Sequence, residues 1–397
     1  MLPKIRAAGL LLATVFFAAI PASAQVGPYR ETGADIMARQ RLADRTAGPR
    51  QQAPRFATPR RRPPASSRPL AAAPASLAAP APGAPQTLGI NFLGANLADS
   101  NAFPPDTMGA VGPSQFLVGI NGRLRSFDKT TGTTDGGLNA DTDVFFVSVR
   151  NSQPTFSPRV RYDRISGRWI VTALNFGASL SNNRILIAVS SSGTISNGTI
   201  WTFSYFEHDL DVPLGDAGFF FDVGSLGVDA NALIIGGNLF DTTGVFQGTT
   251  VHVVRKSAVI SGAGGNVAAS AVAYRNLTGT PDGEGPYTPQ GVDNLSDAAA
   301  TSSWVVGVNN VLPVTSELVL RQITFSAVGA WPPTAISANL TLSVPTTALP
   351  LTVPHLGNTG GADGQLDALD DRLFDAKLRG GHVWTAHNIA VDATGAG

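Results

Sequence analysis

The hexapeptide FLVGIN at residues 116–121 has four later counterparts in the chain, and together they decide the fold class. Each hexapeptide begins with an apolar residue, carries Gly or Ala two places before its end, and ends in Asn. The counterparts are IVTALN (170–175), LIIGGN (233–238), WVVGVN (304–309) and VWTAHN (383–388). A short apolar run bounded by turn residues is typical of a buried strand. Its return at intervals of tens of residues predicts a repeated sheet unit.

Other strand-like segments accompany these hexapeptides. A short segment precedes each one, and a further strand follows each of the first four, at residues 124–128, 184–190, 250–256 and 317–324. Outer strands are expected at residues 143–149, 200–206, 270–276 and 339–344. Repeated four-stranded meanders predict an all-β fold, a β-propeller of four-stranded antiparallel blades with about five blades visible. We expect the terminal Asn to bind the backbone of the next turn, and the small residue to let neighbouring blades pack closely.

The predicted propeller domain spans residues 87–397. Gly397 comes just after the second strand of the fifth blade. An open propeller would expose unpaired strand edges. We therefore expect that the domain is incomplete at its C-terminus, with six or seven blades in the intact protein, or that residues 87–97 complete a blade from the other end.

The first 24 residues have the pattern of a secretion signal. Lys4 and Arg6 precede an apolar run over residues 7–20, and Ala22, Ser23 and Ala24 form a small-residue cleavage site. This predicts a signal peptide over residues 1–24 and a secreted, periplasmic or cell-surface bacterial protein; an uncleaved membrane anchor is the alternative. We expect no transmembrane segment after cleavage. The chain has no Cys, so disulfides cannot stabilise it.

Residues 25–86 are predicted to be a disordered Pro/Ala/Arg-rich spacer, with a short helix around residues 35–42 in its first part. Bulky apolar residues are scarce in this spacer, so it cannot bury enough surface to offset its ordering entropy. It holds ten arginines and three acidic residues, which leaves residues 89–397 with 16 cations and 25 anions. Because phosphate contacts need Lys and Arg, this balance argues against a nucleic-acid partner for the folded part.

Four segments of the chain also carry a resemblance to a known family. The segments PPDTMGAVGPSQFLVGING (104–122) and SPRVRYDRISGRWIVTAL (157–174) are similar to recurrent segments of a family of uncharacterised, large secreted bacterial proteins. So are segments at 220–240 and 365–391. The resemblance covers the chain from about residue 100 to its end and implies a β-propeller-like repeat domain. It implies no catalytic residues, since none is established for the family.

The predicted innermost strands suggest where a ligand would bind. Each of them begins near the central channel, and polar residues stand at those starts: Asp106, Arg159, Asp222, Gln290 and Arg372. A polar ring at the channel face could hold a charged ligand or a sugar. The alternative is that these residues only hydrate the channel and satisfy strand ends.

These observations favour a secreted, non-catalytic binding or scaffold protein that recognises a glycan or another cell-envelope component through the channel face. The alternative is a glycan-active hydrolase or lyase, similar to a sialidase-like propeller enzyme. A third reading is an interaction platform for other proteins. We expect a monomer.

The catalytic motifs in the sequence are weak. YDRISGRW (162–169) is similar to the Asp-box turn of sialidases, and we expect Asp163, Gly167 and Trp169 to shape a hairpin only. A sialidase also needs a Tyr nucleophile beside a Glu. Tyr162 and Tyr287 are available, but no Glu can be assigned to either.

Metal and cofactor sites are equally undefined. No metal-binding His spacing occurs, and His252 and His387 are expected to be packed residues. Three groups of acidic residues could hold calcium, although none has the EF-hand spacing: Asp141 and Asp143; Asp209, Asp211 and Asp216; and Asp363, Asp367, Asp370 and Asp371. We expect no organic cofactor.

Overall fold

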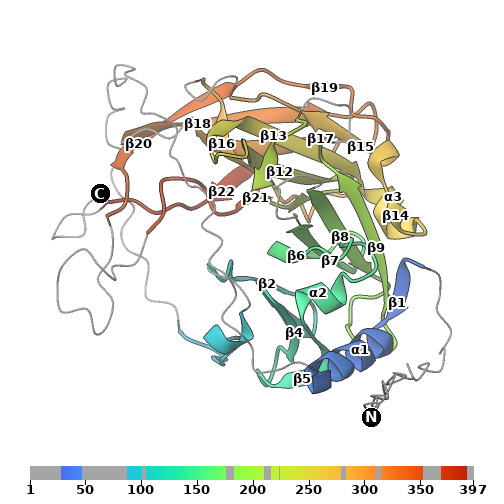
Figure 1. Cartoon of the computed structure of the whole chain (residues 1–397). Helices are drawn as coiled ribbons and strands as arrows, with labels where there is room; N and C mark the ends of the chain where they lie inside the picture. The colour runs from blue at the N-terminus through green and yellow to red at the C-terminus, as the bar shows by residue number, and fades with distance from the viewer. Residues whose placement is uncertain are drawn as a thin grey trace, which may run out of the picture.

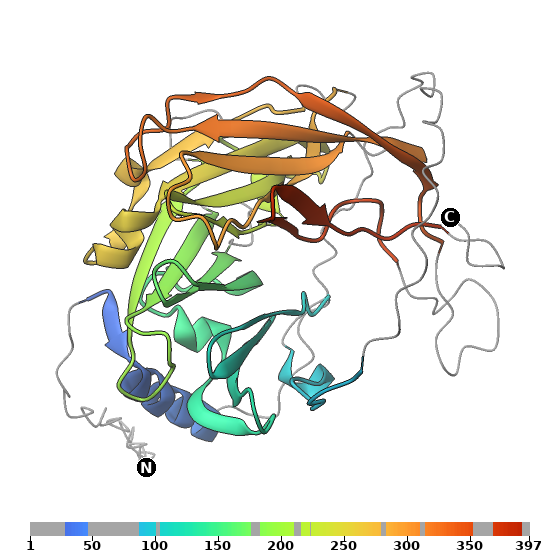
Figure 2. The same ribbon diagram turned by 180° about the vertical axis from the view of Figure 1, so that it is seen from behind.

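The computed structural model describes residues 28–46, 87–100, 104–175, 183–209, 216–222, 224–278, 283–309, 314–351 and 368–390. Over these ranges the protein is almost entirely β-structure, arranged as sheets that fan about a common axis (Figures 1 and 2). The predicted signal peptide and residues 47–86 of the predicted spacer lie outside the described residues. No helix in the described ranges is long and apolar enough to cross a membrane.

Four successive antiparallel sheets form four blades. Blade 1 contains β2 (Met108–Val111), β3 (Gln115–Ile120), β4 (Arg123–Asp128) and β5 (Thr134–Ala140), and blade 2 contains β6 (Thr155–Asp163), β7 (Arg168–Asn175), β8 (Arg184–Ser190) and β9 (Ile200–Glu207). Blade 3 contains β10 (Phe220–Asp222), β11 (Gly227–Val228), β12 (Ala232–Phe240), β13 (Phe246–Arg255) and β15 (Ala271–Tyr274). Blade 4 contains β16 (Pro286–Gly291), β17 (Ser302–Asn309), β18 (Val314–Thr324), β19 (Ala335–Ile336) and β20 (Leu340–Ala348).

A fifth, two-stranded sheet follows, made of β21 (Ala376–Arg379) and β22 (His382–Thr385). The prediction of an all-β propeller with four-stranded antiparallel blades is therefore confirmed. Residues 87–97, which were the alternative means of completing a blade, contain no strand; only the short helix η1 (Leu97–Asp99) forms there. Phe92 of this segment packs on Phe116 and Phe127 of blade 1 instead.

The repeated hexapeptides occupy equivalent places in the first four blades. They lie on β3, β7, β12 and β17, each of which is the neighbour of its blade's innermost strand. The fifth begins on β22, and its last three residues follow that strand. The apolar character of every position has a packing cause, because alternate side chains face different neighbours. Val171 belongs to the core between blades 1 and 2, whereas Ile170 belongs to the core between blades 2 and 3.

The terminal Asn was expected to bind the following turn, but Asn121 and Asn238 bind the next blade. Asn121 Oδ1 accepts a hydrogen bond from the backbone N–H of Ser157 at 2.8 Å, and Asn238 Oδ1 accepts one from Thr288 at 3.0 Å. Both donors are in the next blade. Both have a positive φ, 50° at Ser157 and 46° at Thr288, which is unusual for a residue other than glycine. At Asn121 and Asn238 the hexapeptide thus links successive blades, a role that the sequence did not predict.

The small residue of the hexapeptide has the predicted close-packing role. A Cβ atom on Gly236 would lie 2.2 Å from the carbonyl oxygen of Pro289, on the innermost strand of the next blade. A Cβ atom on Gly119 would lie 3.0 Å from Val160 of blade 2. At Gly236 any larger side chain would push two blades apart.

The first part of the predicted spacer is folded. Strand β1 (Arg30–Thr32) pairs with β9 at the outer edge of blade 2, and helix α1 (Gly33–Thr46) follows it. Thr32 and Asp35 exchange hydrogen bonds that cap the start of this helix, and Ile36 is fully buried. The helix predicted at residues 35–42 is confirmed, and residues 28–46 belong to the propeller fold.

One predicted outer strand is wrong. Residues 143–149 were expected to be the fourth strand of blade 1, but β5 takes that place. Helix α2 (Thr142–Phe145) begins there because Asp141 caps it, accepting a hydrogen bond from the N–H of Asp143 at 2.7 Å. The aromatic residues that suggested a strand are fully buried instead, with Phe145 packed edge-on against Trp201 and Phe203. The remaining short elements are α3 (Lys256–Ser261), β14 (Gly265–Asn266) and η2 (Ala268–Ser270).

Candidate functional site

An ion-pair cluster, in which Arg161 and Asp293 are buried and Asp375 and Lys377 are partly exposed, joins the innermost strands near the centre of the propeller. Arg161 on β6 donates from Nε to Asp293 Oδ2 at 2.7 Å and from Nη2 to Asp375 Oδ1 at 2.6 Å. Lys377 Nζ lies 3.4 Å from Asp293 and 3.2 Å from Asp375. We call Arg161, Asp293, Asp375 and Lys377 the channel ion-pair cluster.

This cluster connects all five sheets. Asp293 Oδ1 accepts a hydrogen bond from the backbone N–H of Val228 in blade 3, at 3.0 Å, and Arg161 Nη1 lies 3.7 Å from the sulfur of Met108 in blade 1. Burial alone would lower the pKa of Arg161, but the charges of Asp293 and Asp375 raise it above its ordinary value. Paired charges therefore connect side chains from several blades here.

The predicted polar ring lies beside this cluster, on or next to the innermost strands. Its residues are not all at strand starts as predicted, because Arg159 lies inside β6 and Asp222 is the last residue of β10. Burial is the main effect on Arg159 and lowers its pKa, while Asp106, Asp222 and Asp375 are near enough to oppose that shift through their charges. Asp222 also acts electrostatically on Arg372. The structure thus brings Asp106, Arg159, Asp222 and Arg372 together, and we call these four residues the channel ring. That they bind a ligand stays a prediction.

The carboxylate of Asp106 is held by two hydrogen bonds. Its Oδ2 accepts from Ser157 Oγ at 3.0 Å and from Asn121 Nδ2 at 3.3 Å. The backbone of Asp106 has φ of 46°, so the residue stands at a bend before β2 and not within the strand. The repeated Asn therefore also orients a channel-ring carboxylate, which connects the repeat to the site.

Gln290, the fifth residue of the predicted polar ring, contacts its own strand. Its side chain is buried and donates from Nε2 to the carbonyl of Thr288 on its own strand, at 3.0 Å. This bond explains its position as local support for the bend in β16. Its predicted ligand role is not tested by these contacts.

Arg372 contacts two residues, Asp370 and Tyr287, that were not predicted as members of the polar ring. Arg372 forms a bidentate ion pair with Asp370, with both N–O distances at 2.6 Å, and donates from Nη2 to Tyr287 Oη at 3.3 Å. Burial would lower the pKa of Arg372, but the hydrogen bonds and charge of Asp370 raise it. A shared backbone feature marks this region. Leu369 has a positive φ, as Asp106, Ser157 and Thr288 do.

Tyr287 does not have the surroundings of an activated nucleophile. It is 2% exposed, and burial raises its pKa to about 12, so its hydroxyl keeps its proton at neutral pH. Its polar neighbours are Arg372 and Asp370, where a sialidase-type Tyr would need a Glu. Tyr162 packs on Trp169 beside the β6–β7 turn.

The YDRISGRW segment forms that turn, as predicted. Asp163 is fully buried and accepts hydrogen bonds from the N–H of Ile165 at 3.1 Å and from Ser166 Oγ at 2.5 Å. Lys256 Nζ lies 2.8 Å from Asp163 Oδ2, the oxygen that also accepts from Ser166, and forms an ion pair with it. Trp169 is likewise fully buried and donates to the carbonyl of Gly193 at 2.9 Å. These contacts account for the motif as a structural turn.

The structure also assembles a set of side chains that could hold a metal ion. His208, Asp216 and His252 each offer one ligand atom, and these atoms all lie within 4.8 Å of one another. Burial lowers the pKa of His208 to about 3 and that of His252 well below its ordinary value, and burial raises the pKa of Asp216. Sequence spacing could not reveal this set, because the two histidines come from different blades. His387, expected to be packed, is half-buried and bonds to the carbonyl of Asp371.

The acidic groups considered for calcium have other contacts where the structure describes them. Asp141 caps α2, Asp143 accepts from the N–H of Thr155, and Asp370 pairs with Arg372. Asp211, Asp363 and Asp367 lie outside the described residues. Calcium binding stays a prediction.

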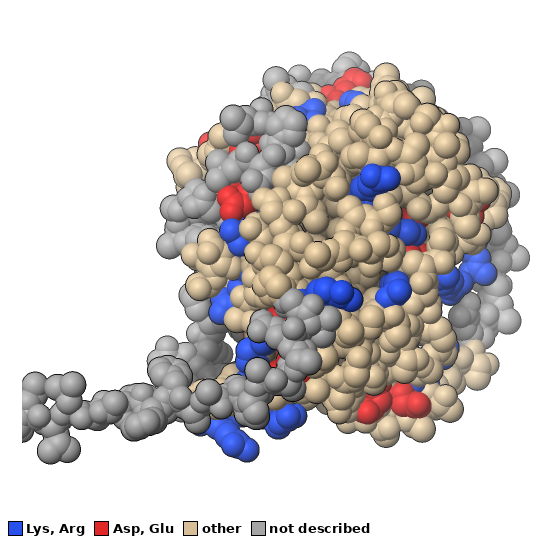
Figure 3. Space-filling model, turned by 90° about the vertical axis from the view of Figure 1, so that its right-hand side faces the viewer, with Lys and Arg blue, Asp and Glu red and all other residues tan. Residues whose placement is uncertain are grey.

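One side of the molecule bears mainly uncharged residues, with scattered Lys and Arg and a few acidic side chains (Figure 3). The cations visible on that side do not merge into one continuous patch. That side therefore shows no continuous basic patch of the kind that nucleic-acid binding needs.

Comparisons with known proteins give structural similarity only. No protein-family model matches the sequence, and no curated protein matches it either. Among solved structures, the chain is similar to an exo-β-1,3-galactanase from Clostridium thermocellum, with 12% identity and a TM-score of 0.33 over 68% of this chain and 53% of that one. An α-L-arabinanase from Penicillium chrysogenum matches with 11% identity and a TM-score of 0.36, over 68% of this chain and 75% of the other. The endosialidase of phage phi92 matches with 11% identity and a TM-score of 0.29, over 72% and 41%.

The match thus spans about half the length of the first of these enzymes. All three similar structures are of glycan-acting enzymes. The favoured prediction, a non-catalytic binding or scaffold protein, is contradicted by this comparison, which agrees better with the glycan-active hydrolase kept as its alternative.

Proposed function

We propose that this protein hydrolyses a glycan at the channel ring. One observation carries the proposal: Asp106 of blade 1 and Asp222 of blade 3 both act on the guanidinium of Arg159 in blade 2. Glycosidic bonds are usually cleaved by two carboxyl groups placed on either side of the scissile bond. Carboxylates from separate blades, both half-buried, supply such a pair without being adjacent in the sequence.

The surroundings of the two carboxylates suggest different roles. Asp222 stands near two guanidinium groups, those of Arg159 and Arg372, and positive neighbours stabilise an ionised carboxylate. We therefore assign Asp222 as the ionised group, acting as nucleophile or as the base for water. Asp106 is then left to protonate the leaving oxygen. The hydrogen bonds from Ser157 and Asn121 hold its carboxyl group in place and do not themselves favour the protonated form.

The channel ion-pair cluster lies next to the channel ring and helps to hold it in place. Arg161 and Asp293 are almost completely buried, so they close the channel next to the ring. Asp375 belongs to that cluster and also acts electrostatically on Arg159. A substrate would then reach the ring from the end where the innermost strands begin.

The test measures hydrolysis of a glycan panel by the full chain. The panel includes arabinan, β-1,3-galactan and a sialic acid polymer, together with aryl glycosides. We expect turnover of at least one substrate and a loss of about 10³-fold in kcat/KM in Asp222→Asn, since acid–base groups contribute about 10²–10⁴-fold. Asp241→Asn, in an exposed turn of blade 3, is the matched control and should keep full activity.

A second measurement separates catalysis from structural support. In Asp106→Asn, activity on aryl glycosides with a good leaving group should be retained far better than activity on the natural bond, because such leaving groups need no protonation. In Asp222→Asn, added azide should restore turnover. Equal losses on both substrate types in Asp106→Asn, or no hydrolysis of any panel member by the wild-type chain, would refute the proposal.

The site of action is also a proposal. Residues 1–24 support export, so we propose that the reaction takes place outside the cytoplasm. N-terminal sequencing of the exported chain should give Gln25 as its first residue; a chain that retains residues 1–24 would contradict cleavage.

A further inference from the structure

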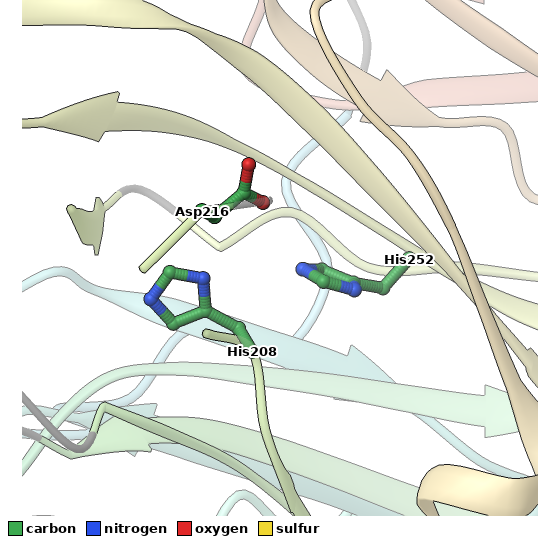
Figure 4. Close-up of side chains that lie close together, drawn as sticks. All are labelled: His208, Asp216 and His252. Carbon is green, nitrogen blue, oxygen red and sulfur yellow. The ribbon is translucent and has the colours of Figure 1, made fainter. Parts of the chain in front are cut away.

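A buried group of side chains between blades 2 and 3 has no part in the proposed hydrolysis. His208 follows β9 in blade 2, His252 lies within β13 of blade 3, and Asp216 precedes β10. The relative exposure of these residues is 0%, 0% and 3%. Figure 4 shows the His252 ring directed toward His208 and Asp216. We call these three residues the imidazole cluster.

The hydrogen bonding of the two rings is incomplete among the described residues. His208 Nε2 lies 3.1 Å from the carbonyl oxygen of Phe219, so it acts as a donor, and Nδ1 of the same ring has no hydrogen-bond partner. Neither ring nitrogen of His252 has a partner there. A buried polar group left without a partner costs about 1–3 kcal/mol. Three such nitrogens in one place therefore point to a bound group. A single metal ion would satisfy two of them, one on each ring.

Aromatic packing does not remove that requirement. The His252 ring lies between Phe206 and Phe221, with ring centroids 5.2 Å and 5.3 Å away. These contacts stabilise the ring but supply no hydrogen-bond donor or acceptor. A residue that only filled this space would be expected to be apolar.

We propose that His208, Asp216 and His252 bind a divalent transition-metal ion, with zinc as the representative. Two imidazoles and one carboxylate form a donor set that suits zinc and its first-row neighbours, whereas calcium and magnesium prefer oxygen ligands. A metal-bound His usually donates its other N–H to a carbonyl or carboxylate. The bond from His208 Nε2 to Phe219 has that form and leaves Nδ1 for the ion.

The carboxylate of Asp216 is positioned in the same manner. Its Oδ2 accepts a hydrogen bond from Thr250 Oγ1 at 3.1 Å and lies 3.0 Å from Arg275 Nε. The other oxygen, Oδ1, is the one that would bind the ion. Arg275 also offsets the negative charge of the carboxylate, so we expect weaker binding than at a site without this cation.

The distances require a small closure. Ligand atoms about 2.1 Å from a tetrahedral zinc are about 3.4 Å apart, whereas these atoms are spread over as much as 4.8 Å. The side chains would therefore approach one another by about 1 Å. Three protein ligands leave at least one position for water.

Metal binding here would support a segment that leads to the channel ring. Phe221 packs against both rings, at 5.6 Å from His208 and 5.3 Å from His252, and Asp222 is the next residue. An ion that held Asp216, His208 and His252 together would fix the short stretch that carries Asp222. We infer a structural role for the ion.

The test uses the full chain, produced without an oligohistidine tag, stripped with EDTA and dialysed against Zn²⁺. We expect one zinc per chain by mass spectrometry after gel filtration. The Tm should rise by about 5 °C at a hundredfold excess of zinc over its Kd. Co²⁺ should give the visible absorption of a low-coordinate site.

Variants assign the binding to these residues. His252→Phe should lose both the bound zinc and the Tm rise, and Asp216→Asn, which keeps the side-chain shape, provides the same test should the first variant fail to fold. His382→Phe changes an exposed histidine in the β21–β22 turn and should bind zinc like the wild type. No zinc retained by the wild-type chain, or equal zinc in Asp216→Asn, would overturn the proposal.

Discussion

The channel ion-pair cluster and the imidazole cluster both contain buried polar side chains and both join residues from separate blades, but they differ in how their polar atoms are satisfied. In the channel, Arg161 lies between Asp293 and Asp375, at 2.7 Å and 2.6 Å. In the imidazole cluster, three ring nitrogens have no hydrogen-bond partner among the described residues. In the first cluster the charged groups satisfy one another, whereas the ring nitrogens of the second point to a bound group.

The largest expected difference follows from removing one partner of the channel ion-pair cluster. Asp293→Ala leaves the buried guanidinium of Arg161 with one of its two carboxylates and leaves the N–H of Val228 without its acceptor. Loss of one partner of a buried pair destabilises by about 3–5 kcal/mol. Urea denaturation of Asp293→Ala should show a decrease of this size in the free energy of unfolding.

The matched control changes another residue of the same cluster. The Lys377 side chain is 56% exposed and pairs with Asp293 at 3.4 Å. Because exposed ion pairs contribute at most about 1 kcal/mol, Lys377→Ala should lower the free energy of unfolding by no more than about 1 kcal/mol. Equal effects of the two substitutions would show that burial of Arg161 does not determine the energy of the cluster.

The corresponding change in the imidazole cluster should have the opposite sign. In metal-free protein, His252→Phe replaces a ring with two unsatisfied nitrogens by an apolar ring of similar size, next to Phe206 and Phe221. We expect the free energy of unfolding to stay the same or to rise by about 1–2 kcal/mol, as buried unsatisfied groups are removed. Thermal denaturation in EDTA measures this. A large destabilisation of the metal-free protein would mean that the His252 nitrogens already have good partners.

A partly exposed pair gives the smallest effect and a defined pH dependence. Burial would raise the pKa of Asp99, but its hydrogen bonds to Arg125 and the N–H of Asn96 outweigh this, and the folded-state pKa is below the ordinary value of 3.8. The stabilisation is therefore present above about pH 3.8 and is lost as the pH falls through the folded-state pKa.

Arg125→Gln should reduce the free energy of unfolding by less than about 1 kcal/mol at pH 7, because surface pairs are weak. The difference between wild type and variant should disappear at the acid end of a pH titration of stability. A difference that stays constant down to pH 2 would show that Arg125 acts through packing and not through the charge of Asp99.

The sequence predicted the fold better than the site, for a physical reason. The hexapeptides repeat because each blade buries the same strand on both faces, so a local pattern reports the architecture. Asp106, Arg159, Asp222 and Arg372 could be proposed because each lies on or just before the strand that precedes a repeated hexapeptide. Their contacts with Asp370 and Tyr287 depend on side-chain conformation, which no spacing encodes.

One wrong prediction and one missed cluster show the limits of local patterns. The aromatic run at residues 143–149 has a strand-like composition, but the cap at Asp141 starts a helix there. His252 alternates in a strand as a packed residue would, yet it meets His208 and Asp216 only because blades 2 and 3 are neighbours. Contacts between distant segments are set by the assembled propeller, and a single sequence does not reveal them.

The most direct test of the central claim is a crystal structure of Asp222→Asn soaked with an oligosaccharide that the wild-type chain cleaves. The account predicts sugar bound at the channel ring, with its scissile oxygen within hydrogen-bond distance of Asp106 and a hydroxyl near Arg159. Sugar bound only on the outer edges of the blades, away from Asp106 and Arg159, would contradict it.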